Sequence, residues 1–135
     1  MITQKYITDL TYRINGACIE VHKKLGPGLA ETVYHKALEK EFQLRNIKFE
    51  SEFLIPVIYK DENLNCDFKC DFLIEDLIVL EIKSVTQILD IRKSQVLNYM
   101  NLLKVPKGIL VNFNVKNLYH LGQETFVNKY FDQLD

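Results

Sequence analysis

The sequence lacks the features that mark a secreted or membrane-spanning protein. Only three cysteines occur among its 135 residues, too few and too odd in number for a disulfide framework. No stretch approaches the roughly 20 apolar residues that cross a bilayer, and the first residues lack the apolar core of a signal peptide. We therefore expect reduced thiols, a cytoplasmic location and no membrane partner.

An excess of positive charge is also missing. The chain has 17 Lys and Arg residues and 18 Asp and Glu residues, which gives a net charge of -1. This balance excludes binding to nucleic acid through a positive field over the whole surface. Repeats, linkers and low-complexity tracts are absent, and the length suits one domain with its own core, so we expect a single domain over residues 1–135.

The small net charge conceals two opposed segments. Residues 61–82 contain seven acidic residues and one lysine, a net charge of -6, whereas residues 83–116 contain six basic residues and one acidic residue, a net charge of +5. This split would place an acidic pocket beside a basic lip, with Arg92 and Lys93, that contacts phosphates. The alternative is that most of these charges lie on solvated turns and helix faces.

Hydrophobic periodicity predicts a mixed α/β fold. Apolar residues at spacings of three and four predict helices over residues 7–25, 29–45 and about 86–103. Strand patterns cover residues 49–59, 66–74, 77–83 and 109–113, followed by a shorter strand over 115–121 and a short helix in 122–135. Pro56 cannot donate to a ladder, which indicates an edge strand, and Glu75-Asp76 predicts a tight turn between antiparallel neighbours.

Polar residues on two neighbouring predicted strands form a candidate catalytic site. Glu81 and Lys83 are two residues apart on a strand, so their side chains project from the same face about 7 Å apart. Across the tight turn, Asp71 opposes Leu80 or Glu81, which brings its carboxylate toward that of Glu81. The two carboxylates and the backbone carbonyl of Ile82 make an all-oxygen site suited to Mg²⁺ or Mn²⁺.

A lysine beside such a site can orient or deprotonate an attacking water and stabilise negative charge on a phosphate. The alternative is that Asp71, Glu81 and Lys83 form a salt-bridge network on an exposed sheet face. The unbroken apolar run that precedes Glu81 argues against this alternative, because a solvated strand should alternate fully.

Two helix residues add to the pattern. Glu31 shares the apolar face of its predicted helix with Tyr34, although an acid in the first turn is also stabilised by the helix dipole. Gln95 interrupts an apolar stripe and either faces the polar site or is a hydrogen-bonded core glutamine. The other members of that stripe are Ile88, Ile91, Tyr99 and Leu102.

Cysteines and histidines show no metal-ligand spacing. On a strand, Cys66 and Cys70 lie about 13 Å apart, too far for one ion, and they share a face with Phe68, so core packing is the better interpretation. The three histidines, His22, His35 and His120, are dispersed over unrelated elements.

Together these motifs resemble the GxxExxY family, a compact branch of the PD-(D/E)xK nuclease superfamily. The name-giving motif is Gly28-Leu29-Ala30-Glu31-Thr32-Val33-Tyr34, and the metal-site pattern is Asp71 followed by Glu81-Ile82-Lys83. Cys70 stands where a proline is usual. The resemblance extends from the first helix through Asn112 and implies a restriction-endonuclease-like core, αβββαβ, with a mixed central sheet flanked by helices and an additional N-terminal helix.

The resemblance also implies residue roles. Asp71 and Glu81 would bind the metal, Lys83 would be the catalytic lysine, and Glu31 would be a further acid near the metal. Gln95 and Tyr99 would support the site or contact the substrate.

The predicted function is a Mg²⁺- or Mn²⁺-dependent nuclease that hydrolyses phosphodiester bonds, with DNA favoured over RNA as the substrate. Two copies would be a natural way to cut both strands of a duplex, so a homodimer is one expected arrangement. The alternative is a catalytically inactive module on the same fold that binds nucleic acid or a protein partner. A small-molecule enzyme ranks last because the sequence has no cofactor signature.

Overall fold

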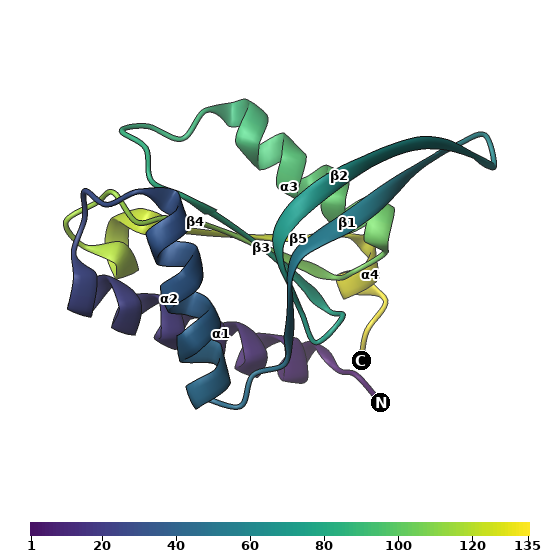
Figure 1. Ribbon diagram of the computed structural model, residues 1–135. Coiled ribbons are helices and arrows are strands. Elements are labelled where there is room, and N and C mark those ends of the chain that lie inside the picture. Colours follow the sequence, from purple (N-terminus) through teal and green to yellow (C-terminus); the bar gives the residue numbers. More distant parts are fainter.

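A computed structural model describes all 135 residues as ten helices and strands (Figure 1). In chain order they are α1 (Gln4–Leu25), α2 (Glu31–Leu44), β1 (Phe49–Tyr59), β2 (Glu62–Ile74), β3 (Ile78–Lys83), α3 (Asp90–Leu103), β4 (Lys107–Asn112), the π-helix η1 (Leu118–Gly122), β5 (Gln123–Val127) and α4 (Lys129–Asp132). None of the helices is long and apolar enough to cross a membrane.

The five strands form one mixed sheet in the order β1-β2-β3-β4-β5. Strands β3 and β4 are parallel and are joined by the crossover helix α3, whereas every other neighbouring pair is antiparallel. Helices α1 and α2 cover one face of the sheet, and α3 covers the other (Figure 1). The predicted α/β class is confirmed: a restriction-endonuclease-like, mixed central sheet flanked by helices, with an additional N-terminal helix.

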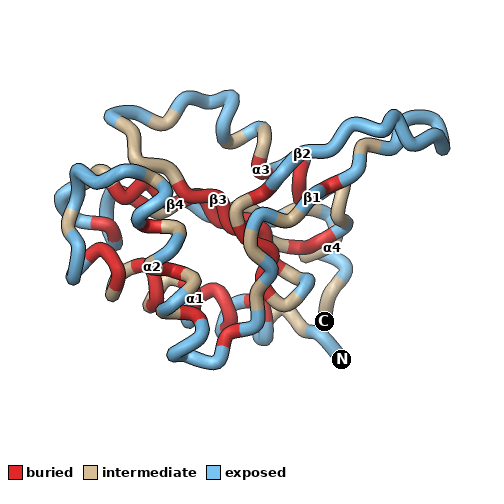
Figure 2. Tube along the Cα trace, viewed as in Figure 1, coloured by how far each residue is buried: buried red, intermediate tan, exposed pale blue.

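Alternation along β3 divides the interior into two cores. Ile78, Leu80 and Ile82 belong to the larger core, which includes the buried faces of α1 and α2. Val79 belongs to the smaller core beneath α3. Because side chains alternate across a strand, Glu81 and Lys83 lie on the same face of β3 as Val79. Buried residues concentrate along the middle of the sheet (Figure 2).

Helix α1 begins and ends close to the predicted limits. Thr3 caps its first turn by accepting a hydrogen bond from the Tyr6 N–H at 3.0 Å, which extends the helix three residues before the predicted start. It ends at Gly26, whose φ of 72° lies in the left-handed region that favours glycine.

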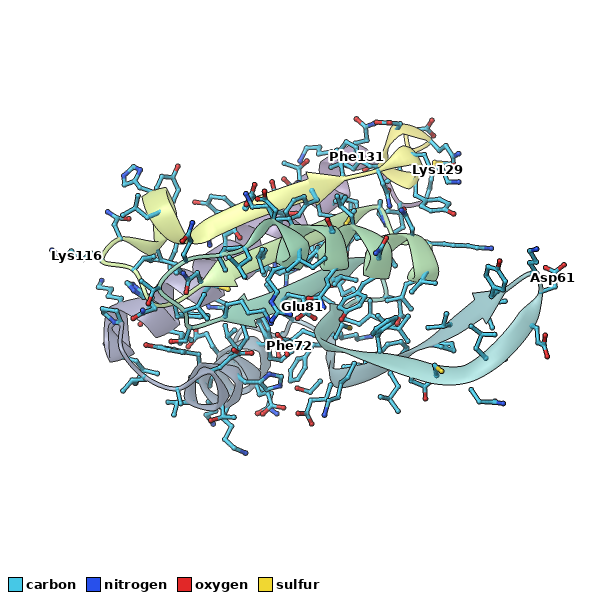
Figure 3. The ribbon with its side chains drawn as sticks, turned by 90° about the horizontal axis from the view of Figure 1, so that it is seen from above. Asp61, Phe72, Glu81, Lys116, Lys129 and Phe131 are labelled. Atoms are coloured by element: carbon cyan, nitrogen blue, oxygen red, sulfur yellow. The ribbon has the colours of Figure 1, made fainter.

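Strands β1 and β2 extend beyond the body as a twisted two-stranded arm, whose tip is marked by Asp61 (Figures 1 and 3). Strand β1 is an edge strand, as Pro56 predicts. The expectation of a half-buried strand is wrong for residues 66–69, which are all exposed because no second layer covers them. Cys66 is therefore exposed rather than packed in the core, whereas Cys70 is buried as predicted.

Helix α3 differs from its predicted form. It begins at Asp90 rather than near residue 86, and Ile91 from the predicted apolar stripe is 59% exposed. The buried face instead consists of Val96, Tyr99 and Met100. A side chain added at Gly108 of β4 would lie 2.6 Å from both Val96 Cγ1 and Met100 Sδ, so this glycine permits the close approach that selects the buried face.

The C-terminal segment also differs from prediction. Residues expected to form a last strand, 115–121, contain most of the π-helix η1 instead. The last strand is β5, which pairs with β4 in a region expected to be helical, and only the four-residue α4 follows it. The predicted turn at Glu75-Asp76 is confirmed, with φ of 52° and 58° at its two residues.

Candidate active site

Asp71 and Glu81 meet where the pairing between β2 and β3 ends. The ladder runs from Ile74 opposite Ile78 to Phe72 opposite Leu80, and the next pair in register is Asp71 and Glu81. Here side chains replace the ladder. The Asp71 N–H donates to Glu81 Oε1 at 2.9 Å, and the Ile82 N–H donates to Asp71 Oδ2 at 2.8 Å. The predicted approach of the two carboxylates is confirmed.

Glu81 is an acid held in a poorly solvated place near the middle of the molecule (Figure 3). It is only 7% exposed. Burial is the larger cause, and the charge of Asp71 the second, of a pKa raised to about 8, although the Asp71 N–H and Lys83 favour the charged form. A cation next to these two carboxylates would reduce both unfavourable effects.

Lys83, two residues after Glu81 on the same face of β3, lies between two acids. Its Nζ atom is 3.8 Å from Glu81 Oε2 and 4.0 Å from Glu31 Oε1. One ion pair of the alternative interpretation, Lys83 with Glu81, therefore exists, but Glu81 lies in the interior rather than on an exposed sheet face. Removing one partner from such a network leaves the remaining charges uncompensated.

Glu31 is the first residue of α2, and its position satisfies both interpretations of its role. It lies in the first turn, where the helix dipole favours an acid, and it also points to Lys83 of the site. Its side chain is 42% exposed, so it lies at the margin of the apolar face rather than within it. The structure contains no group of three or more acidic, histidine or cysteine side chains arranged around one ion position. Glu31 is instead connected to Glu81 through Lys83, which forms an ion pair with each of them.

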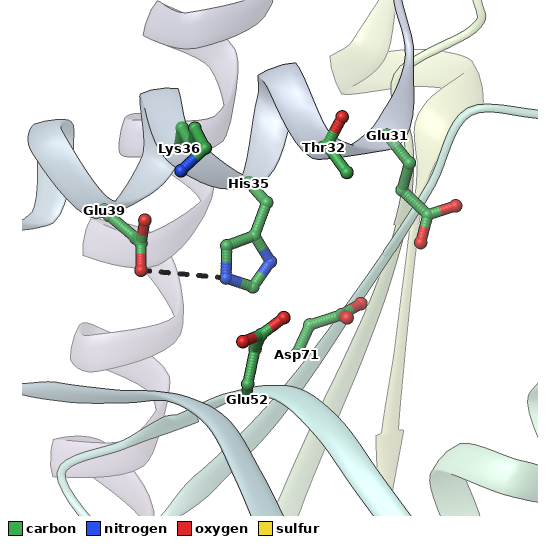
Figure 4. Close-up of a pocket in the computed structure, with 7 residues that line it drawn as sticks. All are labelled: Glu31, Thr32, His35, Lys36, Glu39, Glu52 and Asp71. Carbon is green, nitrogen blue, oxygen red and sulfur yellow. Dashed lines mark ion pairs between the residues drawn. The ribbon is translucent and has the colours of Figure 1, made fainter.

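A polar cleft of about 350 Å³ opens beside Asp71 (Figure 4). Side chains of α2 lie on one side of the cleft, and Glu52 of β1 and Asp71 of β2 lie on the other. No hydrophobic residue lines it. The lining consists of Glu31, Thr32, His35, Lys36, Glu39, Glu52 and Asp71.

Sequence reasoning missed His35, which lies on the α2 side of this cleft with Glu31. His35 Nε2 is 2.8 Å from Ser51 Oγ, which donates to Glu39 Oε2 at 2.6 Å. The imidazole also stacks on Phe72, with ring centres 4.3 Å apart. A helical spacing of four from Glu31 to His35 could have indicated that both residues face the same cleft.

Glu52 is a second residue of the cleft that sequence reasoning missed. The register of β1 and β2 pairs Ser51 with Phe72 and Phe53 with Cys70, which leaves Glu52 opposite Asp71. Like charges in this arrangement repel one another. The backbone of Glu52 has a φ of 52°, a conformation that costs a non-glycine residue free energy. Such a pairing could be found only after the strand register was known.

The two site residues predicted on α3 have different surroundings: Tyr99 lies near Glu81 and Asp71, and Gln95 lies beside Arg92. Tyr99 is buried, and its pKa is raised by burial and then by the charges of Glu81, Cys70 and Asp71. Gln95 is half-buried and accepts a hydrogen bond from Arg92 Nη1 at 3.2 Å.

The expected basic lip is partly neutralised. Lys93 Nζ is 3.3 Å from Glu124 Oε2 of β5 and 4.0 Å from Asp90 Oδ1, so its charge is paired within the protein. Arg92 remains exposed. Of the two residues, Arg92 is the one free to meet a phosphate.

The donor set at the β2–β3 junction fits a hard divalent cation. Each carboxylate uses one oxygen for a backbone hydrogen bond, which leaves Asp71 Oδ1 and Glu81 Oε2 for other partners. The Ile82 carbonyl projects from the same side of the strand as its N–H, toward Asp71. Oxygen ligands of this kind suit Mg²⁺ or Mn²⁺.

Comparison with family models gives a match over most of the chain. Residues 8–123 match the family model of the PD-(D/E)XK nuclease superfamily. No curated protein and no solved structure matches the chain.

Proposed function

Because the chain belongs to the PD-(D/E)XK nuclease superfamily, we propose that it is a divalent-metal-dependent nuclease acting on DNA in preference to RNA. Membership implies a nucleic acid as substrate and phosphodiester hydrolysis as the reaction. The observation that carries the proposal is the Asp71–Glu81 pair, with Lys83 placed 3.8 Å from Glu81.

The ion would be Mg²⁺ or Mn²⁺, held by Asp71, Glu81 and the Ile82 carbonyl, with Glu31 as a further acid. When bound, it would polarise the scissile phosphate and lower the pKa of a coordinated water. The burial of Glu81 and the closeness of Asp71 support this assignment, because the two acids lack a compensating charge other than Lys83.

Lys83 would position the attacking water and stabilise the negative charge that develops on the phosphate. Its two ion pairs hold the ammonium group at the site, so its orientation needs little rearrangement when substrate binds. Gln95 and Tyr99 would support the site from α3, and Arg92 would contact the nucleic-acid backbone, whereas Lys93 is paired with Glu124.

Finer assignments rest on the motif and on composition. The Gly28-to-Tyr34 motif supports placement in the GxxExxY branch, and one continuous sheet supports a single functional unit over residues 1–135. The three free cysteines suit a reducing, cytoplasmic location. A homodimer would allow both strands of a duplex to be cut.

The proposal is tested by incubating the purified protein with single- and double-stranded DNA and RNA, with Mg²⁺, with Mn²⁺ and with a chelator. We expect metal-dependent cleavage, fastest on DNA. Lys83→Ala should lower the rate by about 10²- to 10³-fold, as when a group aimed at developing charge is removed.

Lys40→Ala is the matched control, because Lys40 is exposed on α2, and it should cut like the wild type. Circular dichroism checks that Lys83→Ala remains folded. Absence of metal-dependent cleavage on all four substrates would refute the proposal. If nucleic acid still bound, the result would favour the inactive binding module.

A further inference from the structure

The loop between α1 and α2 is attached to the site through both backbone polar groups of one residue, Leu29. The Leu29 N–H donates to Tyr34 Oη at 3.1 Å, and the Leu29 carbonyl accepts from Ser84 Oγ at 2.6 Å. Tyr34 Oη donates its own proton to the Gly26 carbonyl at 2.5 Å. Ser84 directly follows Lys83, so the bond to Leu29 connects the end of β3 to the segment that precedes Glu31.

A second set of contacts returns from Tyr34 to Lys83. The Tyr34 ring stacks on Phe113, with ring centres 4.4 Å apart and planes 9° apart. The Phe113 N–H donates to the Lys83 carbonyl at 2.9 Å. The contacts therefore close a ring through Lys83, Ser84, Leu29, Tyr34 and Phe113.

The start of α2 depends on this ring because it has no cap of its own. Ala30, at the N-cap position, makes no side-chain hydrogen bond to the first turn. Gly28 has a φ of 94°, a conformation that glycine adopts freely, so the local sequence restrains the chain weakly between Pro27 and Leu29. The two bonds to Leu29 are what fix the point from which Glu31 extends toward Lys83.

We propose that Tyr34 and Ser84 are positioning residues that hold Glu31 against Lys83, through the backbone N–H and carbonyl of Leu29 and the stack on Phe113. The inference rests on the proposed function and adds to it two residues that act on the reaction without touching substrate. It accounts for the three-residue spacing from Glu31 to Tyr34: the acid starts the helix, and the tyrosine one turn later reaches back to anchor the loop before it.

The experiment is a double-mutant cycle between Ser84→Ala and Glu31→Gln. Ser84→Ala should lower kcat by about 3- to 10-fold, the equivalent of one net hydrogen bond, with KM unchanged. In the Glu31→Gln background the same change should have no further effect, and Ser84→Thr, which keeps the hydroxyl, should retain activity. An equal loss in both backgrounds would overturn the inference.

Matched controls separate positioning from stability. Ser94→Ala removes an exposed serine hydroxyl from α3, and Tyr12→Phe removes the hydroxyl of a tyrosine that is exposed on α1. Neither should change kcat, whereas Tyr34→Phe should lower it. A loss in Ser84→Ala that disappears when the assay temperature is adjusted for its melting temperature would mark a purely structural role.

Two further measurements do not depend on cleavage. Amide hydrogen exchange of Leu29 should accelerate in Tyr34→Phe but not in Tyr12→Phe. The affinity for Mn²⁺, measured by calorimetry, should fall in Ser84→Ala but should not fall further when Ser84→Ala is added to Glu31→Gln. If the wild type neither cuts nor binds Mn²⁺, the proposed function fails, and Leu29 exchange still decides whether Tyr34 holds the loop. Unchanged exchange in Tyr34→Phe would overturn the inference.

Discussion

Strand β3 presents two faces of different chemistry to the two helical layers. Ile78, Leu80 and Ile82 are fully buried in the larger core against α1 and α2. On the opposite face, only Val79 belongs to a core, and Glu81 and Lys83 follow it. Burial of the apolar side chains stabilises the sheet. The opposite face of the strand can therefore hold buried charged residues although their desolvation costs free energy.

The largest effect on stability is expected on the apolar face. Leu80→Ala should lower the free energy of unfolding by about 2 to 5 kcal/mol, because it removes a fully buried side chain and leaves a cavity. Chemical denaturation followed by circular dichroism measures the change. Leu64→Ala, on the exposed arm, is the control and should change stability much less. Equal losses at the two positions would contradict the division of the faces.

On the polar face, the largest effect should be on activity and metal binding. Asp71→Asn should lower cleavage by about 10²- to 10³-fold and abolish Mg²⁺ binding in calorimetry, because one ligand charge is lost. Asp67→Asn, on the exposed arm, should bind the ion and cut like the wild type. Retained ion binding in Asp71→Asn would place the metal elsewhere.

A smaller effect should appear in the pH dependence of stability without metal. The pKa of Glu81 rises from 4.5 to about 8 in the folded protein, so between these values the folded state holds a proton that the unfolded state has released. The contribution of Glu81 to stability is therefore present below pH 4.5 and lost as the pH rises toward 8.

Glu81→Gln should flatten this part of the profile and raise stability at pH 8 by a few kcal/mol relative to the wild type. Melting temperatures measured in chelator from pH 5 to 8.5 provide the comparison. Glu62→Gln, on the exposed arm, is the control. A wild-type profile that rises through this window would show that Glu81 is ionised when folded.

The smallest effect is expected on the arm. Ile58 is 51% exposed and contributes to neither core, so Ile58→Ser should change the free energy of unfolding by less than about 0.5 kcal/mol. The cleavage rate of small substrates should also stay unchanged. A large loss of stability would mean that the arm is covered in solution, which size-exclusion chromatography of wild type and variant would detect.

Local sequence patterns predicted the position of the site residues more accurately than they predicted which neighbouring residues are buried. The turn at Glu75-Asp76 sets the register of β2 and β3, so counting from it placed Asp71 opposite Leu80 or Glu81, and the structure selects Glu81. The same alternation rule failed on the arm, because a period of two shows which side chains share a face but not whether another layer covers that face. Phe68, at 46% exposure, illustrates the difference.

The sequence by itself determined the element order through β4, the edge position of β1, and the proximity of Asp71, Glu81 and Lys83, because these follow from hydrophobic period, proline chemistry and one short turn. Only the tertiary structure decided that Lys83 lies between Glu31 and Glu81, that His35 and Glu52 share a cleft with Asp71, and that Ser84 anchors the loop before α2. These contacts join residues from different helices and strands, so they depend on how the helices pack on the sheet, which no local pattern encodes.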